Sequence, residues 1–246
     1  MYNFFVDKTE FLSDTPRIVG KDFNHLKNVL RFKVGDRFCI SADGKSNLCE
    51  IVGFDNESVL LKVIERDFMD TTLPISISLF QGLPKQDKLE LIIQKAVELG
   101  ADQIVPVEMK RSVVKIEEKK KEAKTERFNA ISESAAKQCK RQVVPNVLTP
   151  QSFINALSLA KEFDHVLVPY ECENGMQGTS NALKEIKQGD KVAVFIGPEG
   201  GFDDKEIIAL KEMGAKIISL GKRILRTETA SITALSMLML YAEINL

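Results

Sequence analysis

The sequence lacks the features that mark membrane and secreted proteins. None of its apolar runs approaches the roughly 20 residues that are needed to cross a bilayer. The N-terminal segment, MYNFFVDKTEFL, has no basic stretch followed by an apolar one, so we expect no secretion signal. These absences predict a cytoplasmic protein that has no membrane partner.

Cysteine and histidine are scarce as well. The cysteines are scattered and form no C-x-x-C pair, and only His25 and His165 could join them in a metal site. This pattern predicts neither a zinc site nor a disulfide framework, and we expect no metal and reduced thiols. The cysteines are Cys39, Cys49, Cys139 and Cys172.

The net charge of −1 gives no overall attraction for nucleic acid, but the charge is unevenly placed. Lysine and arginine outnumber the acids in residues 17–37 and 85–141, whereas acids predominate in residues 150–215. Basic patches that lie on one face bind phosphate even on a neutral protein. Ordinary solvated faces explain the same composition equally well.

The first 70 residues predict a small, mostly β unit. Asp22 is expected to cap a short helix over residues 23–32, and Asp43-Gly44 suits a hairpin turn. Residues 58–65 predict a further strand, and strands of this length with turn signals indicate a compact barrel. A linker is expected at residues 69–74.

From residue 75 the pattern alternates between short buried strands and helices. This alternation predicts an α/β domain with a mostly parallel sheet covered by helices. The final helix, residues 231–244, is apolar on most of its surface, so it is either central to the domain or half of a subunit interface. Strands are expected at 75–83, 103–109, 165–170, 191–197 and 216–221.

One of these strands runs directly into a glycine-rich loop, GPEGGFD (197–203). A phosphate-binding Walker loop needs a lysine after its last glycine, where this chain has Phe202, and the dinucleotide fingerprint needs a different spacing. A plain strand-to-helix turn capped by Asp203 or Asp204 is the simple alternative. The stretch LGKRILRTETA (220–230) also follows a strand, and such loops face one crevice in a parallel sheet. Together the loops suit a neutral adenine ring and a zwitterionic tail better than a polyphosphate.

GPEGGF and LGKRILRTETA, in this order, resemble the knotted SPOUT-class RNA methyltransferases. Three further blocks resemble the ribosomal RNA small subunit methyltransferase E family in the same order, and the resemblance spans nearly the whole chain. One departure is Lys140, where we expect the family to favour glycine. The three blocks are HLKNVLRFKVGD (25–36), LPKQDKLELIIQKAVELG (83–100) and AAKQCKRQVVP (135–145).

The resemblance implies a PUA-like RNA-binding β-barrel over residues 1–70 and a SPOUT α/β domain with a deep trefoil knot over residues 75–246. It also implies S-adenosylmethionine as cofactor, a homodimer, and methylation of uridine N3 in the 16S rRNA of the small ribosomal subunit. Two alternatives stay open: a non-catalytic rRNA-binding module that retains the fold, and a SPOUT methyltransferase that acts on another RNA.

Roles for single residues follow from the same resemblance. Arg226 is expected to stabilise the negative charge that forms on the uracil ring when N3 loses its proton, with a salt bridge to Glu199 or Glu228 as the competing interpretation. Independently of the resemblance, Thr227 and Thr229 are expected to cap the last helix. Cofactor contacts are expected from Pro169, Gly197, Glu199, Gly200, Leu220, Gly221, Ile224 and Leu225, of which Ile224 and Leu225 fit a core position equally well. RNA contacts are expected from Arg17, His25, Lys27, Arg31, Lys85, Arg111, Lys137, Gln138 and Arg141.

Overall fold

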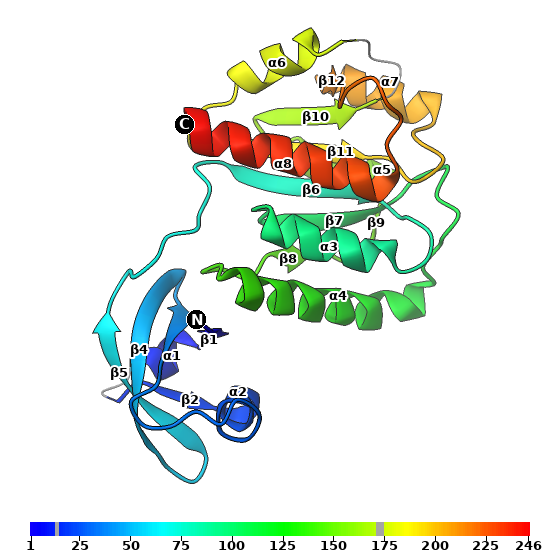
Figure 1. Ribbon diagram of the computed structural model, residues 1–246. Coiled ribbons are helices and arrows are strands. Elements are labelled where there is room, and N and C mark those ends of the chain that lie inside the picture. The colour runs from blue at the N-terminus through cyan, green and yellow to red at the C-terminus, as the bar shows by residue number, and fades with distance from the viewer. Residues whose placement is uncertain (13–14, 171–174) are drawn as a thin grey trace. The chain divides into compact units, whose positions relative to one another are not determined.

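The computed structural model describes residues 1–12, 15–170 and 175–246, so Cys172 lies outside the described residues (Figure 1). The chain divides into two compact units, each of which combines two segments. The smaller unit holds Met1–Thr72 and Ala136–Val144, and the larger holds Leu73–Ala135 and Pro145–Leu246. Within the described ranges, no helix combines the length and the apolar character that a membrane span requires.

The smaller unit is built on a five-stranded sheet in the order β1-β3-β4-β5-β2, which forms a PUA-like half-barrel. β1 pairs with β3 in parallel, and the remaining pairs are antiparallel. Asp43 and Gly44 join β3 to β4 with φ values of 52° and 73°, the left-handed geometry of a tight hairpin. The strands are β1 (Asn3–Phe5), β2 (Arg17–Val19), β3 (Arg37–Ala42), β4 (Lys45–Phe54) and β5 (Ser58–Glu65).

The helical segments of this unit begin differently from the prediction. Helix α1 spans Lys8–Phe11, and helix α2 (Gly20–Asn24) continues into a π-helical turn, η1 (His25–Val29). The prediction that Asp22 caps this helix is wrong, because the helix begins at Gly20 and no side chain caps it. The Asp22 carboxylate instead accepts a hydrogen bond from Lys137 Nζ at 3.1 Å.

The segment Ala136–Val144 packs into the smaller unit through its backbone. The carbonyl of Arg141 accepts hydrogen bonds from Asn3 Nδ2 and Ser41 Oγ, both at 3.2 Å. Lys140 has a φ of 63°, which lies in the left-handed region that glycine adopts most easily. The position therefore has a physical reason to favour glycine, and the lysine in this chain occupies it at a conformational cost.

The larger unit contains a parallel sheet in the order β12-β10-β11-β6-β7-β8, with β9 also paired to β7. Its central strands are apolar and buried on both faces, and Phe80 stacks on Phe195 with ring centroids 4.4 Å apart. The predicted mostly parallel sheet is confirmed. The strands are β6 (Ser76–Gly82), β7 (Gln103–Glu108), β8 (Asn146–Val147), β9 (Gln151–Ser152), β10 (His165–Pro169), β11 (Lys191–Ile196) and β12 (Lys216–Ile218).

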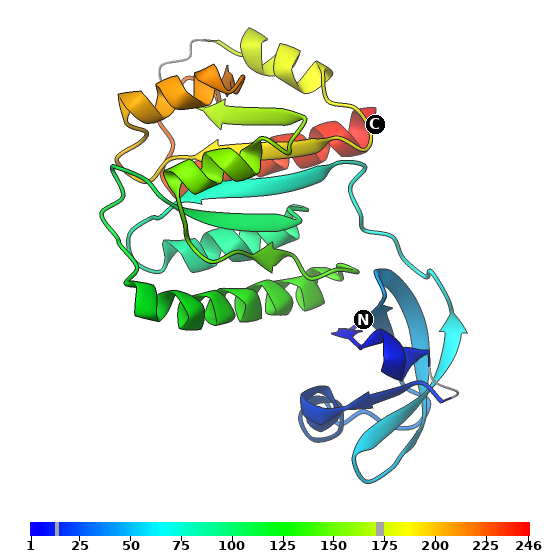
Figure 2. The same ribbon diagram turned by 180° about the vertical axis from the view of Figure 1, so that it is seen from behind.

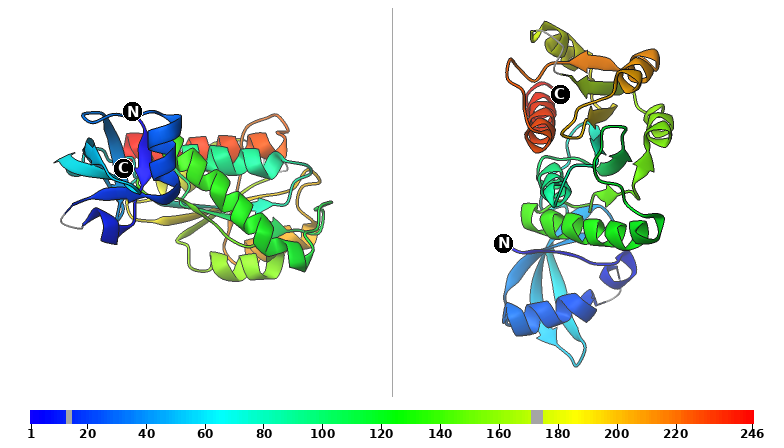
Figure 3. Two further views of the ribbon diagram at one scale, coloured as in Figure 1. Left: turned by 90° about the horizontal axis from the view of Figure 1, so that it is seen from below. Right: turned by 90° about the vertical axis from the view of Figure 1, so that its right-hand side faces the viewer.

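Helices cover both faces of this sheet. Helices α3 and α8 lie side by side on the face turned to the viewer in Figure 1, and α5 and α7 lie on the opposite face, which Figure 2 shows from behind. The edge-on view of Figure 3 separates the two helical layers. The helices are α3 (Lys88–Glu98), α4 (Glu118–Cys139), α5 (Phe153–Ala160), α6 (Gln177–Lys184), α7 (Asp204–Glu212) and α8 (Thr227–Asn245).

Candidate ligand pocket at the carboxyl ends of the strands

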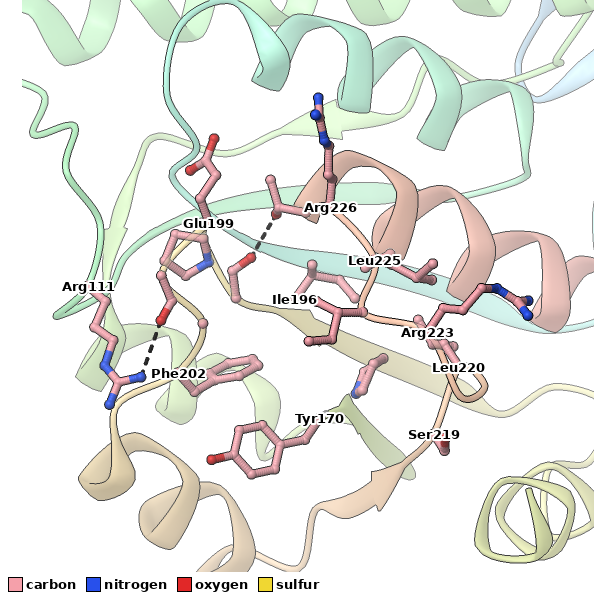
Figure 4. A pocket seen from close by; sticks show the side chains of 18 of the residues that line it. Arg111, Tyr170, Ile196, Glu199, Phe202, Ser219, Leu220, Arg223, Leu225 and Arg226 are labelled. Carbon is pink, nitrogen blue, oxygen red and sulfur yellow. Dashed lines mark hydrogen bonds between the residues drawn. The ribbon is translucent and has the colours of Figure 1, made fainter. Parts of the chain in front are cut away.

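A cavity of about 440 Å³ opens at the carboxyl ends of β10, β11 and β12 (Figure 4). Its walls come from the end of β10 with Tyr170, from the glycine loop (residues 197–203) and from the basic loop (residues 219–226). All residues for which we expected cofactor contacts line this cavity, and Arg226 lines it too. Ligands of open α/β sheets bind at this edge of the sheet.

The glycine loop is held closely against the end of β6. A Cβ atom on Gly82 would lie only 2.7 Å from the backbone nitrogen of Pro198 and 2.9 Å from Met109 Sδ. A Cβ on Gly197 would lie 3.1 Å from the carbonyl carbon of Gly201, across the turn. Glycine at these positions therefore allows backbone contacts that any larger side chain would disturb.

The exit of the glycine loop is fixed by helix α7 and by the loop after β7. Asp203 and Glu206 form a capping box, which confirms the predicted cap at Asp203. Lys110 donates through its backbone N–H to Glu206 Oε1 and through Nζ to Asp203 Oδ2, both at 2.8 Å. Arg111 Nη1 donates to the carbonyl oxygen of Gly200 at 3.2 Å. The hydrogen bond from Lys110 is the largest cause of the lowered pKa of Asp203, which keeps this cap ionised.

Glu199 turns its carboxylate toward the start of α3. Its oxygens accept hydrogen bonds from the Lys85 backbone N–H at 3.1 Å and from Lys88 Nζ at 3.0 Å. Desolvation raises the pKa of this carboxyl, but the hydrogen bonds from the Glu199 and Lys85 backbone and from Lys88 outweigh it and lower the pKa overall. The expected contact between Glu199 and a cationic part of the cofactor stays a prediction.

Neither of the two carboxylates that we considered, Glu199 and Glu228, forms a salt bridge with Arg226. Glu199 and Glu228 both pair with Lys88, at 3.0 and 3.3 Å. No ion pair of Arg226 is formed within residues 1–12, 15–170 and 175–246. Its exposed guanidinium at the rim of the cavity points away from the glycine loop (Figure 4).

Thr227 joins the two loops. Its hydroxyl donates to the carbonyl oxygen of Gly197 at 2.7 Å and accepts from Gln81 Nε2 at 3.0 Å. The prediction that Thr227 and Thr229 cap α8 is wrong, because both lie inside the helix, the N-cap position is Arg226 and no side chain makes a capping hydrogen bond there. At the other end of the basic loop, Ser219 N–H donates to Thr179 Oγ1 at 2.9 Å.

The middle of the basic loop presents side chains to solvent. Ile224 is 84% exposed, so it is not a core residue, whereas Leu220 and Leu225 are half-buried. Arg223 and Arg226 are both exposed, and their side chains point to different sides of the loop (Figure 4). The rim of the cavity therefore carries cations, and its floor offers glycine backbone and the buried ring of Phe202. This combination suits a planar ring in the cavity and a polyanion at its mouth.

The residues expected to bind RNA belong to both units and differ in exposure. In the larger unit, Arg111 lines the cavity and Lys85 is exposed beside it. In the smaller unit, Lys137 pairs with Asp22, and Arg141 is only 8% exposed, so its side chain offers little surface to RNA. Contacts of all these residues with RNA stay predictions. The exposed members of the smaller unit are Arg17, His25, Lys27, Arg31 and Gln138.

Sequence reasoning missed Lys88 and Gln81, which hold the walls of the cavity. Lys88 lies in the block LPKQDKLELIIQKAVELG, but its partners come more than a hundred positions later in the chain. Gln81 is fully buried, donates to Thr227 and accepts from Ser231 Oγ. An isolated glutamine at the end of an apolar strand was the only local signal for it.

Comparisons with known proteins agree with this geometry. Residues 71–239 match the RNA methyltransferase domain family, and residues 18–64 match the RNA methyltransferase PUA domain. Ribosomal RNA small subunit methyltransferase E of Bacillus subtilis is 38% identical over 99% of this chain and 98% of its own length. Its counterpart in Mesomycoplasma hyopneumoniae is 31% identical over 96% of this chain and 98% of its own.

A solved structure extends the likeness to three dimensions. The crystal structure of ribosomal RNA small subunit methyltransferase E from Neisseria gonorrhoeae bound to S-adenosyl methionine matches with a TM-score of 0.81. That protein is 28% identical, and the match covers 98% of this chain and 97% of the other. The chain belongs to the ribosomal RNA small subunit methyltransferase E family.

Proposed function

We propose that this protein methylates N3 of a uridine in the 16S rRNA of the small ribosomal subunit, with S-adenosylmethionine bound in the cavity. The lining of the cavity supports this proposal most directly. Its floor is made of glycine backbone and apolar side chains from loops that Thr227 joins, and its rim is cationic. A relative with the same fold and family holds S-adenosyl methionine in its crystal structure.

Glycine backbone, Leu220 and Leu225 would hold the cofactor, which supplies a methyl group on an activated sulfonium sulfur. The protein then has little covalent work to do. It must align the nucleophile with the methyl group, and good alignment contributes roughly 7–11 kcal/mol to such reactions. The fixed glycine loop provides one rigid wall for that alignment.

Uridine N3 becomes a nucleophile only when its proton leaves. The guanidinium of Arg226 is exposed at the rim, and its positive charge stabilises the negative charge that remains on the uracil carbonyls. Hydrogen bonding to Glu199 raises the pKa of Lys88, which stays protonated and cannot serve as the base. The lowered pKa of Glu199 makes its carboxylate a weak base.

RNA is held, in this proposal, by the exposed cations of both units, and the N3 edge must be unpaired to be reached. Arg31 of the smaller unit would bind phosphate. Arg31→Ala should weaken RNA binding and reduce its salt dependence, while the methylation rate at saturating RNA stays nearly unchanged. Filter-binding titrations at several salt concentrations would measure both effects.

We further infer a homodimer and a trefoil knot in the C-terminal segment, and we expect the enzyme to act in the cytoplasm, where ribosomal subunits are made. The outer side of α8 supports the dimer, since Leu240 and Ile244 are 51% and 76% exposed. An apolar stripe of this kind fits a two-fold interface. Light scattering that reports a monomer at micromolar concentration would contradict the dimer.

Calorimetric titration tests the cofactor assignment. S-adenosylhomocysteine should bind without any added metal and more tightly than ATP, because the glycine loop has no lysine to hold a polyphosphate. Tighter binding of ATP would contradict the proposal. Absence of any binding of S-adenosylhomocysteine would favour the alternative of a non-catalytic rRNA-binding module.

A further inference from the structure

Lys88, the first residue of α3, lines the cavity at the point where its walls meet. Its Nζ atom is 3.0 Å from Glu199 Oε1 in the glycine loop and 3.3 Å from Glu228 Oε2 in the first turn of α8. The side chains of Lys88 and Glu199 are 26% exposed and that of Glu228 is 17% exposed. One cation thus faces two carboxylates in a site that is largely shielded from water.

The two carboxylates depend on Lys88 to different degrees. Glu199 also accepts a hydrogen bond from the Lys85 backbone N–H, at 3.1 Å. Glu228 Oε2 is buried and accepts no hydrogen bond from the described residues, so the ion pair with Lys88 is the interaction that offsets its desolvation. Without the lysine, two like charges would face each other across the gap between the glycine loop and α8.

This arrangement adds a second link between the glycine loop and the start of α8, next to the hydrogen bond from Thr227 to Gly197. Glu199 is central in the glycine loop, and Glu228 lies two residues after Arg226. Any movement of α8 away from the glycine loop would therefore separate Lys88 from one of its partners. Such movement would also displace Arg226 and widen the cavity.

We propose that Lys88 is a positioning residue that fixes the glycine loop relative to the start of α8 and so keeps the cavity in its ligand-binding shape without contacting the ligand. The proposal rests on the proposed function only for the identity of the ligand used to test it. Its structural part, the fastening of the glycine loop, holds for the protein with no ligand bound.

The test compares Lys88→Met with Lys95→Met. Lys95 lies on the same helix and pairs with Glu98 at 2.8 Å, so its substitution removes an ion pair of similar length away from the cavity. Lys88→Met should bind S-adenosylhomocysteine roughly fivefold to tenfold more weakly in calorimetry, about 1 kcal/mol. Lys88→Arg should recover part of this loss, and Lys95→Met should bind as the wild type does.

Two further measurements separate positioning from direct contact. In a Glu199→Gln/Glu228→Gln background Lys88 has no carboxylate left to hold, so adding Lys88→Met should change the affinity less than twofold. Without ligand, Lys88→Met should also accelerate hydrogen exchange of the backbone amides of residues 199–202 several-fold.

Three results would overturn the proposal: an unchanged affinity in Lys88→Met, a full fivefold to tenfold loss that persists in the double-glutamine background, or unchanged hydrogen exchange in the glycine loop. A persisting loss would mean that Lys88 contacts the ligand itself. If the wild-type protein fails to bind S-adenosylhomocysteine, the proposed function fails. The hydrogen-exchange measurement still decides the role of Lys88 in that case.

Discussion

The glycine loop and the basic loop face the same cavity but are built in opposite ways. The glycine loop is fastened along its whole length: Pro198 packs on Gly82, Glu199 pairs with Lys88, and the carbonyl of Gly200 accepts from Arg111. The basic loop is fastened at its two ends, by the hydrogen bonds of Ser219 and Thr227. Its middle, including Ile224 and the two arginines, is exposed.

This difference separates two tasks. A loop whose backbone is fixed in advance binds a ligand at a lower entropic cost, since little has to be ordered on binding. A loop that presents exposed side chains contributes groups that act on the RNA or cover the bound cofactor. We therefore expect substitutions in the glycine loop to affect stability and cofactor affinity together, and substitutions in the basic loop to affect function alone.

The largest effect is expected at Arg226. Arg226→Ala should reduce single-turnover methyl transfer roughly a hundredfold or more, as the loss of one electrostatic stabiliser does. Cofactor affinity and thermal stability should stay nearly unchanged, because the side chain is exposed and no ion pair among the described residues depends on it. Arg226→Lys should recover only part of the rate, because a point charge does not reproduce the planar guanidinium. A normal rate for Arg226→Ala at saturating RNA would show that this arginine only anchors RNA.

Gly82→Ala tests the fastening of the glycine loop. The added Cβ would lie 2.7 Å from the Pro198 backbone, so we expect the free energy of unfolding to fall by about 2 kcal/mol. The affinity for S-adenosylhomocysteine should fall with it. In the control Gly53→Ala the new Cβ would meet Leu60 at an ordinary 3.6 Å, and the loss should be much smaller. Urea unfolding measures both variants. Equal losses of unfolding free energy in Gly82→Ala and Gly53→Ala would show that the close contact with Pro198 does not matter for stability.

Ile224→Ser tests the exposed loop. Because Ile224 is 84% exposed, the free energy of unfolding should change by less than about 0.5 kcal/mol. If the side chain covers the bound cofactor, the affinity for S-adenosylhomocysteine should drop several-fold in calorimetry. Ile208→Ser alters another exposed isoleucine, on α7, and should leave the affinity unchanged. Unchanged affinity in both variants would remove Ile224 from the cofactor site.

The smallest effect is expected outside both loops, at Lys140. Its φ of 63° is strained for a side chain with a Cβ, so Lys140→Gly should stabilise the protein by up to about 1 kcal/mol. Lys140→Ala keeps the Cβ and should give none of this gain. Thermal unfolding of both variants measures the difference, and equal melting temperatures would show that the left-handed backbone is not the reason for a glycine there.

Much of this organisation was predictable because it depends on local patterns. Alternating apolar segments predicted the parallel sheet, and the two motifs GPEGGF and LGKRILRTETA predicted a cavity at the ends of β11 and β12, the strands on either side of β10. The Asp203 cap followed from its position before a helix. These features need only a few neighbouring residues to be recognised.

The contacts between the walls of the cavity could not be predicted from local sequence patterns. Thr227 has the sequence position of a helix cap, yet its hydroxyl donates a hydrogen bond to the carbonyl oxygen of Gly197, thirty residues earlier. Lys88 resembles any lysine at the start of a helix, and only the folded chain brings it to Glu199 and Glu228. The capping role predicted for Asp22 was wrong because α2 begins earlier, at Gly20. Long-range partners decide these roles, and a periodic pattern does not contain them.

The most direct test of the function is mass spectrometry of 16S rRNA from a strain that lacks this protein. The RNA, free or in small subunits, is incubated with the protein and S-adenosylmethionine, digested, and mapped to single nucleotides. We expect that one uridine gains a methyl group on N3 and that Arg226→Ala abolishes nearly all of this gain within the same time. Methylation of another base, or no methylation by a protein that binds S-adenosylhomocysteine, would contradict this expectation.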